Sequence, residues 1–390
     1  MQVEDLPARD RFKSKGWWKV APLVGILLDR RVLHRALHGG RTFERVDYYA
    51  EAAESLGVDL VFFDLDGLRL GSRRVSGFAP VRRGTSGRGT PGRLEFVRRT
   101  VPLPSVVHKR ALYRSRRASE RVRRLERDGV YVFNPEVSWD KYRIDRMLRG
   151  EPRLVPHLPE TALVGPDGYS WFRAQLEAGT EVFVKPRQGS LGLGIARVVP
   201  LGGRRCRFEA GGRRIDTTLR GAWRLVRRGR RRHLMQAGVP LLEEEGRRVD
   251  LRVPVQRGGD GRWHIAGIAA KRAERHAFLT NVARGASVHM ARELLARRFG
   301  AGEAARVVRG VEELAVTVAQ TLSARHPRVA DLGLDVGVDR RGHPYLIEVN
   351  RRDLRVMLGM CNDRDGHRAL FANPIAYARH VLVRGASHAG

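Results

Sequence analysis

The alternation of hydrophobic and polar positions is clearest in the stretch 181–200. Val182 to Val184 form an apolar run that stops at Lys185 and Pro186, and a glycine-rich segment follows at once. After the glycines, residues 195–199 alternate with a period of two, which predicts a second strand rather than a helix. We therefore expect a strand, a glycine loop and a returning strand, which together make a β-hairpin whose tip has few side chains.

The first third of the chain shows apolar runs of strand length separated by segments with helical spacing. This order of strand, helix and strand predicts a small α/β layer. Glycines, prolines and arginines between residues 77 and 92 show no periodicity, so we expect a loop or flap there. The predicted strands are 22–29, 59–64, 105–110 and 130–135, and the predicted helices are 43–56 and the Arg-rich stretch 115–127.

The remainder of the chain predicts a second layer after a break rich in proline and glycine. That break places a domain boundary between about residues 136 and 160. An Arg-rich segment that ends at Arg232 is poorly patterned, and we expect no regular element in it. The predicted helices are 140–148, 169–178 and 292–324, and the predicted strands are 233–242 and the antiparallel pair 249–256 and 263–273.

Carboxylates interrupt the apolar strands of a hairpin at residues 332–350. In the register that pairs its two strands, Asp335 comes opposite Glu348, and Asn350 lies two residues further on the same face. Two carboxylates and an amide oxygen form a hard-oxygen set suited to Mg²⁺ bound with phosphates. Ordinary surface alternation is the competing explanation, but an unpaired charge within apolar strands is expensive.

The glycine loop does not match two familiar nucleotide-binding devices. A Rossmann fingerprint places its glycines before a helix, and a Walker A loop needs Lys-Ser or Lys-Thr directly after the last glycine. A hairpin tip without side chains can instead lie over a polyphosphate, with its N–H groups and the Ser190 hydroxyl directed at oxygens and Lys185 reaching the phosphates. A tight, flexible turn without a ligand is the alternative.

The charge of the chain is strongly positive, with 74 basic residues, 42 acidic residues and a formal net charge of +32. Such a field favours polyanions, including nucleic acid, acidic polymers and anionic surfaces. Only seven of the basic residues are Lys. An Arg excess spread over the whole chain favours general compositional drift over a dedicated nucleic-acid site.

Cysteine and hydropathy patterns point to a reduced compartment. Cys206 and Cys361 are the two cysteines, and no CxxC spacing occurs. A reduced, intracellular setting fits this usage. No apolar run is long enough for a signal peptide or a membrane span, so we expect a soluble, cytoplasmic protein with residues 1–20 as a basic lead-in.

Several ordered motifs together resemble the ATP-grasp enzymes, and more narrowly the YheC/YheD-type ATP-grasp proteins described as endospore coat-associated. They are KPRQGSLGLGI, VDLRV, NVARG, GLDVGVD and LIEVN, in this order. The resemblance implies an α/β (α+β) chain with an ATP-grasp fold and an N-terminal Rossmann-like pre-ATP-grasp domain. That domain would span 21–135 and the ATP-grasp domain 136–390, with a small lid subdomain at about 153–238 and a larger metal-binding subdomain at about 239–390.

The resemblance also implies roles for individual residues. Lys141 and Lys185 would contact the phosphates and the adenine side of ATP, and Arg252 would stabilise the transferring phosphoryl group. The remaining expectations are Gly189, Ser190, Gly192 and Gly194 in the lid, Gln236 to Val239 at the adenine edge, Lys271, Asn281 and Arg284 toward the carboxylate substrate, and Asp335, Glu348 and Asn350 on Mg²⁺ or Mn²⁺. Arg351, Arg352 and Asp353 depart from the small, less charged continuation expected after Asn350.

The chemistry that this resemblance implies is ATP-dependent ligation of a carboxylate to an amine or thiol through an acyl phosphate. A strongly basic protein suits an acidic small molecule or peptide as the carboxylate substrate. Spore coat or cell-surface maturation would be its setting. Two alternatives stay open: a catalytically silent nucleotide-binding coat or assembly protein, and a basic nucleic-acid binder, which is less favoured.

Overall fold

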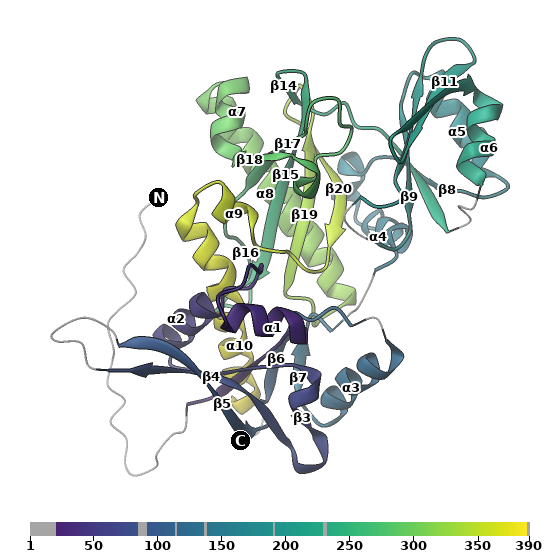
Figure 1. Ribbon diagram of the computed structural model, residues 1–390. Coiled ribbons are helices and arrows are strands. Elements are labelled where there is room, and N and C mark those ends of the chain that lie inside the picture. The colour runs from purple at the N-terminus through teal and green to yellow at the C-terminus, as the bar shows by residue number, and fades with distance from the viewer. Residues whose placement is uncertain are drawn as a thin grey trace.

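The computed structural model describes residues 21–84, 92–113, 115–135, 139–189, 192–228 and 232–387. The predicted lead-in 1–20 and Ser190 lie outside these residues. Within them the strands form three sheets of seven, six and seven strands. The N-terminal sheet lies at one end of the molecule, the six-stranded sheet at the other, and the third sheet between them (Figure 1).

The N-terminal sheet has a parallel centre, as expected for an α/β layer. Strands β2, β1, β6 and β7 run parallel, and β3, β4 and β5 extend the sheet by antiparallel pairing. Its elements are β1 (Leu23–Leu27), α1 (Arg30–Leu37), α2 (Val46–Leu56), β2 (Asp59–Phe63), β3 (Leu68–Arg69), β4 (Arg74–Arg83), β5 (Arg93–Pro102), β6 (Val106–Lys109), α3 (Arg116–Arg127) and β7 (Tyr131–Phe133).

The six-stranded sheet carries the glycine loop between its strands β9 and β10, which pair antiparallel as predicted. Its strand order is β12-β11-β10-β9-β13-β8. Helices α5 and α6 cover one face of this sheet (Figure 1). The elements are β8 (Thr161–Leu163), α5 (Gly168–Glu177), β9 (Val182–Pro186), β10 (Ala196–Pro200), β11 (Arg205–Ala210), β12 (Arg213–Thr218), α6 (Leu219–Arg227) and β13 (His233–Ala237), preceded by α4 (Lys141–Leu148) and the 3₁₀ helix Pro152–His157.

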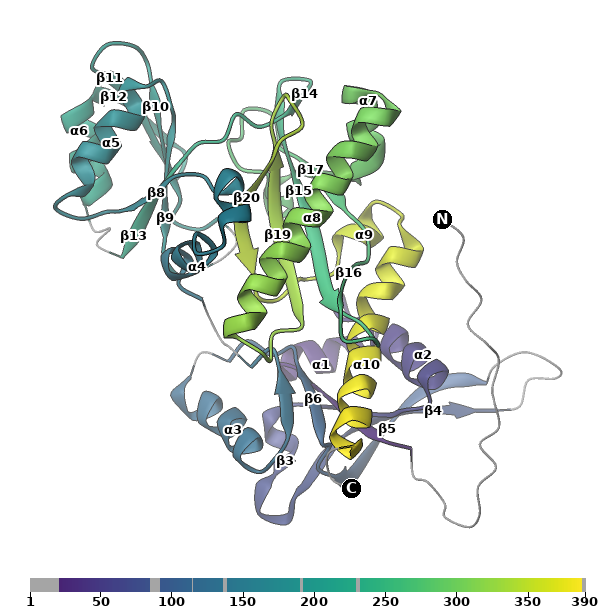
Figure 2. The same ribbon diagram turned by 180° about the vertical axis from the view of Figure 1, so that it is seen from behind.

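The third sheet carries the predicted carboxylates on β19 and β20. It is ordered β18-β17-β15-β19-β20, with β14 and β16 also paired to β15. Helix α8 covers one face of it (Figure 2). The elements are β14 (Glu243–Glu244), β15 (Arg247–Arg257), β16 (Trp263–Ile265), β17 (Ala269–Arg272), β18 (Ser287–Met290), α7 (Ala291–Phe299), α8 (Ala301–Arg325), β19 (Asp331–Val338), β20 (Pro344–Asn350), α9 (Met357–Met360) and α10 (Arg364–Ser387).

Helix α10, the last helix, packs on α2 and on the N-terminal sheet (Figures 1 and 2). Leu370, Phe371 and Ile375 of α10 are fully buried in one cluster with Val24 and Phe62. The N-terminal sheet and the last helix therefore share a core. This helix was not predicted, since residues beyond 358 carry no motif.

Two predictions for secondary structure were wrong. Within the segment 77–92, expected to be a loop or flap, residues 77–83 belong to β4, which pairs antiparallel with β5, and residues 85–91 lie outside the described residues. The Arg-rich segment that ends at Arg232 contains β11, β12 and α6. In both places arginines occupy exposed positions, and the alternation of apolar and polar residues is hard to see in the sequence. In the second segment Cys206, Phe208 and Val226 still face the core.

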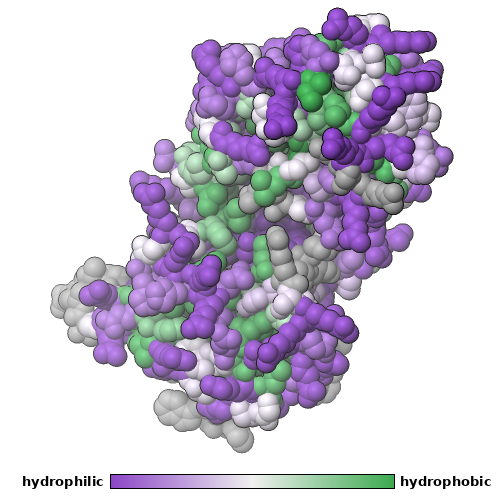
Figure 3. Space-filling model, turned by 45° about the vertical axis from the view of Figure 1, so that its right-hand side comes forward, coloured by the Kyte–Doolittle hydropathy of each residue, from purple (hydrophilic) through white to green (hydrophobic). Residues whose placement is uncertain are grey.

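Hydrophilic side chains are spread over both lobes of the face shown in Figure 3, and apolar residues form smaller groups between them. This distribution agrees with a basic composition shared by the whole chain. Within the described part of the chain, no helix combines the length and the apolar character needed to cross a membrane.

Candidate functional site

The predicted carboxylate pair is formed by β19 and β20. Asp335 lies opposite Glu348 in the antiparallel register, and a bulge follows between Asp335 and Val336. Apolar residues of β19 alternate with Asp335 and pack under α8, so Asp335 lies on the opposite face of the sheet. Asn350 donates from Nδ2 to Oδ2 of Asp335 over 2.9 Å. The three residues predicted as a metal set are therefore neighbours.

Two cations from adjacent strands hold Asp335. Lys271 of β17 lies 2.7 Å from Oδ1 of Asp335 and 2.9 Å from Oδ1 of Asp250. Nη1 of Arg252, on β15, donates to Oδ2 of Asp335 over 3.1 Å. Because Arg252 is directly opposite Asp335 in the sheet, strand register alone places this guanidinium at the carboxylate.

Burial and charge act in opposite directions on these groups. Burial raises the pKa of Asp335, but Arg252 and Lys271 outweigh it and hold that pKa below its usual value. Burial lowers the pKa of Lys271, yet Asp250 and Asp335 raise it overall. Burial also raises the pKa of Asp250, and the nearby Asp335 adds to that rise. The shifts of Asp335 and Lys271 both favour the charged form of a buried pair.

The residues present fit a divalent cation of the Mg²⁺ class. Glu348 has a side chain that is 27% exposed, and its recorded ion pair is with Lys141 over 3.3 Å. Asn350 uses its amide nitrogen on Asp335, which leaves its carbonyl oxygen for a ligand. No group of three His, Cys, Asp or Glu side chains forms a metal cluster in the described residues. Two carboxylates and one amide leave coordination positions for phosphate oxygens and water, as Mg²⁺ prefers.

The glycine hairpin, formed by β9, β10 and the loop between them, depends on glycine for its backbone. Gly189, Gly192 and Gly194 have φ values of 121°, 67° and 75°, a region that side chains disfavour. A Cβ on Gly192 would lie 3.1 Å from Leu279 Cδ1 and 3.6 Å from Asn281 Nδ2. The hairpin therefore approaches the loop that precedes β18 closely, and larger side chains would hold the two apart.

Two lysines place positive charge beside the hairpin. Lys141, at the start of α4, donates to the carbonyl of Gly189 over 2.7 Å. Lys185 is buried on β9 and donates to Oε1 of Gln236 over 2.5 Å. Burial lowers the pKa of Lys185 to about 8, with Glu348 opposing and Lys141 adding to the change. An anion near these two ammonium groups would stabilise both.

The predicted adenine edge follows β13. Gln236 is paired with Phe183 in the sheet and is partly buried, as is Val239. The N–H of Gly238 donates to the carbonyl of Glu181 over 2.7 Å. Backbone groups at 236–239 thus lie beside the base of the glycine hairpin, where the resemblance places the nucleobase.

The structure does not bring together all the residues that were expected to hold a substrate carboxylate. Oδ1 of Asn281 accepts from the N–H of Ala283, and Asn281 lies against Gly192 as described above. Arg284 is exposed, and its side chain makes neither a hydrogen bond nor an ion pair with described residues. The structure therefore brings Lys271 and Arg252 together at Asp335, but not Arg284.

Three residues that contact the candidate site were not predicted as site residues from the sequence. Asp250 and Thr280 bond to each other beside Lys271, and Asp353 lies 3.4 Å from Nε of Arg252. Asp250 could have been found, because it shares a face of β15 with Arg252 at a spacing of two residues. Asp353 could not, since the segment after β20 has no periodicity.

A family model described as YheC/D like ATP-grasp matches residues 129–381. The endospore coat-associated protein YheD of Bacillus subtilis (strain 168) is 24% identical over 268 residues. That match covers 65% of this chain and 58% of the relative, so the chain spans less than two thirds of the relative's length.

Solved structures with a similar fold are also known. The crystal structure of D-cycloserine synthetase DcsG shows 15% identity and a TM-score of 0.50, covering 92% of this chain and 99% of its own. A RiPP-associated ATP-grasp ligase from Chryseobacterium gregarium, in complex with ADP and a leader and core peptide, shows 14% identity and a TM-score of 0.47, covering 91% and 95%. The predicted fold class is confirmed.

Proposed function

Because the chain belongs to the YheC/D-like ATP-grasp family, we propose that it is an ATP-dependent ligase that joins a substrate carboxylate to an amine or a thiol. One observation carries the proposal most directly. Asp335 and Glu348 are register partners that face away from the core, with Arg252, Lys271 and Lys141 within ion-pair distance of one or the other.

The nucleotide would lie between the glycine hairpin and the third sheet. Lys141 and Lys185 would neutralise its phosphates, and the N–H groups of the hairpin would point at phosphate oxygens. The predicted contribution of Ser190 belongs to the same loop. Gln236 to Val239 would offer backbone groups to the adenine edge. Asp335, Glu348 and Asn350 would hold Mg²⁺ or Mn²⁺, which when bound supplies further neutralisation of phosphate charge.

The proposed chemistry has two steps. The substrate carboxylate attacks the γ-phosphorus of ATP, so that a carboxyl O–P bond forms, the bond from the γ-phosphorus to the bridging oxygen breaks, and ADP leaves. The amine or thiol then attacks the acyl carbon, loses its proton and displaces inorganic phosphate. Arg252 would stabilise the equatorial oxygens during transfer, and the closed glycine hairpin would keep water from the acyl phosphate.

The carboxylate substrate that fits best is acidic, either a small molecule or a peptide. Lys271 contacts Asp335 of the carboxylate pair, and Asn281 lies beside Gly192 of the hairpin. These two residues would therefore define how the substrate approaches the site. The remaining assignment, Arg284, would reach substrate only if the exposed loop around it moves inward. A cytoplasmic location with association to a spore coat is proposed from the relative's name alone.

The experiment that tests the proposal traps the acyl phosphate. The protein is incubated with MgATP, a set of acidic amino acids and peptides, and hydroxylamine, and both ADP and hydroxamate are measured. Equal amounts of the two products from the wild-type protein, and neither from Glu348→Gln, are expected. Nucleotide binding without either product would favour a silent binder. Retention on nucleic acid that salt removes, without nucleotide binding, would favour the nucleic-acid alternative.

A further inference from the structure

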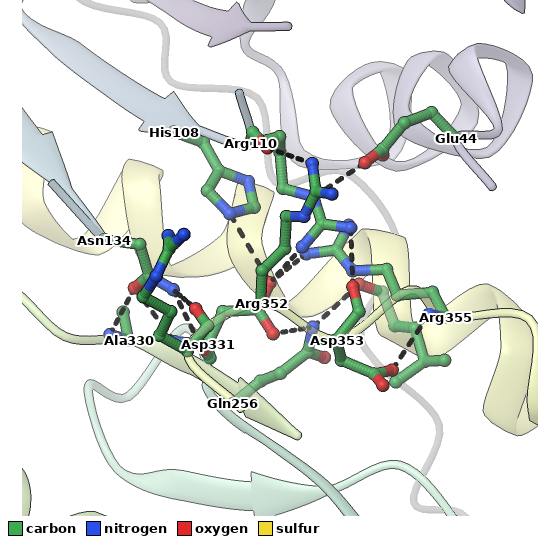
Figure 4. Close-up of polar contacts among 12 residues, drawn as sticks. Glu44, His108, Arg110, Asn134, Gln256, Ala330, Asp331, Arg352, Asp353 and Arg355 are labelled. Atoms are coloured by element: carbon green, nitrogen blue, oxygen red, sulfur yellow. Dashed lines mark hydrogen bonds and ion pairs between the residues drawn. The ribbon is translucent and has the colours of Figure 1, made fainter. Parts of the chain in front are cut away.

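A buried cluster of charged side chains lies directly behind the candidate site. Its centre is Asp331, the first residue of β19, whose side chain is 0% exposed. Oδ2 of Asp331 pairs with Nη1 of Arg110 over 3.2 Å and with Nη2 of Arg355. Nε2 of Gln256 donates to Oδ1 of Asp331 over 3.2 Å. Figure 4 shows these groups converging on one carboxylate.

The N-terminal sheet supplies half of this cluster. Arg110 follows β6 and also pairs with the buried Glu44 over 2.8 Å. Asn134 follows β7 and accepts on Oδ1 from the N–H groups of Ala330 and Asp331 over 2.8 and 3.2 Å. Two parallel strands of one sheet thus end at the start of a strand in another. The contact is polar and buried, although Nε of Arg355 and the ring nitrogens of His108 make no hydrogen bond within the described residues.

The same groups hold the segment 351–355, which follows the predicted metal ligand Asn350. Asn134 donates to the carbonyl of Arg351 over 3.1 Å. Nη2 of Arg110 donates to the carbonyl of Asp353 over 2.7 Å, and Nη1 of Arg352 donates to the carbonyl of Arg110 over 2.7 Å. Of the charged residues that depart from the family's expected continuation, Arg352 contributes its side chain to this junction, whereas Arg351 and Asp353 contribute backbone carbonyls here.

Asp353 extends from the junction into the candidate site. Its Oδ1 lies 3.4 Å from Nε of Arg252, whose Nη1 reaches Asp335. Oδ2 of Asp353 accepts from the N–H of Arg355 over 3.0 Å, so the carboxylate is fixed from its own segment as well. Asp353 can lie there because Gly333 has no side chain. A Cβ on Gly333 would come within 2.9 Å of Oδ1 of Asp353.

We propose that Asp353 is a positioning residue for Arg252, held in place by the N-terminal sheet through Arg110. The proposal rests on the proposed function, in which Arg252 stabilises the transferring phosphoryl group. Arg252 lies between two carboxylates, Asp335 on β19 and Asp353 in the segment after β20. Nη1 donates to Asp335, whereas Nε forms an ion pair with Asp353 at 3.4 Å without a hydrogen bond. When a bound cation also uses the carboxylate of Asp335, Asp353 is the partner that keeps the guanidinium plane of Arg252 fixed.

Burying this many charges is costly, and a hydrophobic junction would be at least as stable. A structural role alone therefore does not account for the charge on Asp353. An orienting role does, because a guanidinium a fraction of an ångström out of place loses much of its effect on developing charge.

The test compares binding of MgADP with binding of MgADP plus fluoroaluminate, which imitates the transferring phosphoryl group. Asp353→Asn should keep MgADP affinity, yet lose at least about tenfold of the affinity gained with fluoroaluminate, since contacts to charged groups carry such factors. Arg252→Ala should lose the same gain, and the double variant should be no worse than Arg252→Ala alone. Glu44→Gln is the matched control, because it removes one buried carboxylate of the cluster that does not touch Arg252.

A second variant keeps the test independent of the charge change. Gly333→Ala should displace Asp353 and reproduce the effect of Asp353→Asn on the fluoroaluminate complex. Equal behaviour of Asp353→Asn and Glu44→Gln, with the gain intact in both, would overturn the role of Asp353. Absence of MgADP binding by the wild-type protein would instead overturn the proposed function, so the two failures are distinguishable.

Discussion

Two aspartates on one face of β19, Asp331 and Asp335, are buried among cations but have different surroundings. Asp331 is 0% exposed, and its partners come from the N-terminal sheet and from the segment after β20. Asp335 has a side chain that is 12% exposed, and its partners come from β15, β17 and β20. Four residues along one strand thus separate an enclosed junction from a site beside an accessible carboxylate, Glu348.

The electrostatic setting of the two residues is similar in sign. Burial raises the pKa of Asp331, but Arg355, His108 and Arg110 outweigh it and hold that pKa far below its usual value. The pKa of Asp335 is lowered in the same way by Arg252 and Lys271. A shifted pKa therefore does not identify the functional aspartate. What distinguishes Asp335 is that its side chain is 12% exposed and lies beside the accessible Glu348, so a cation could reach it.

The largest expected effect separates the two residues by stability. Asp331→Asn leaves Arg355 without a carboxylate in the interior and should lower the free energy of unfolding by about 3 to 5 kcal/mol. Asp335→Asn should cost about 1 to 2 kcal/mol, because Lys271 keeps Asp250 and Arg252 keeps Asp353. Urea unfolding of both variants measures the difference. Equal losses of unfolding free energy in the two variants would mean that Asp331 and Asp335 do not differ in structural role.

A smaller effect concerns the shared cation. Lys271→Met leaves Asp250 without its cation and Asp335 with Arg252 alone, and should cost about 2 kcal/mol at neutral pH. MgCl₂ without nucleotide should restore part of that loss, because the site is open to a cation. Arg110→Met, in the enclosed junction, is the matched control and should show no response to Mg²⁺. A similar response in both variants would contradict the comparison.

Much of the difference between Asp331 and Asp335 could not be predicted from the sequence. The glycine hairpin, the pairing of Asp335 with Glu348 and an α/β layer at the N-terminus follow from local periodicity, and they were predicted. Asp331 follows the same alternation as Asp335, so nothing local marks it as structural. Its partners Arg110 and Arg355 are 221 and 24 residues away and meet it only through the packing of separate sheets. The role of Asp353 depends on the same long-range contacts.

The last prediction concerns the pH dependence contributed by the junction. Burial lowers the pKa of His108 to about 3, with Asp331 opposing and Arg355 adding to the change. The unfolded chain takes up this proton near pH 6.5 and the folded chain does not. The contribution of His108 to the free energy of unfolding is therefore fully present above pH 6.5. It falls by about 1.4 kcal/mol per pH unit as the pH is lowered toward 3.

Replacing His108 with a neutral side chain of similar size should remove that slope. Urea unfolding of wild type and His108→Leu at pH 7, 6, 5 and 4 gives the comparison, with the difference between the two proteins as the quantity of interest. We expect the destabilisation caused by the substitution to shrink steadily below pH 6.5. A difference that stays constant with pH would show that His108 has the same pKa in the folded and unfolded protein.

The central claim, a nucleotide site completed by Glu348 opposite Asp335, is tested most directly by thermal unfolding with ATP or ADP, with and without Mg²⁺. The wild-type protein should be stabilised by nucleotide, and more strongly when Mg²⁺ is present. Glu348→Ala should keep the metal-free stabilisation, since Lys141 and Lys185 remain, and should lose the part that depends on Mg²⁺. An equal Mg²⁺-dependent shift in both proteins would contradict the assignment of the metal site.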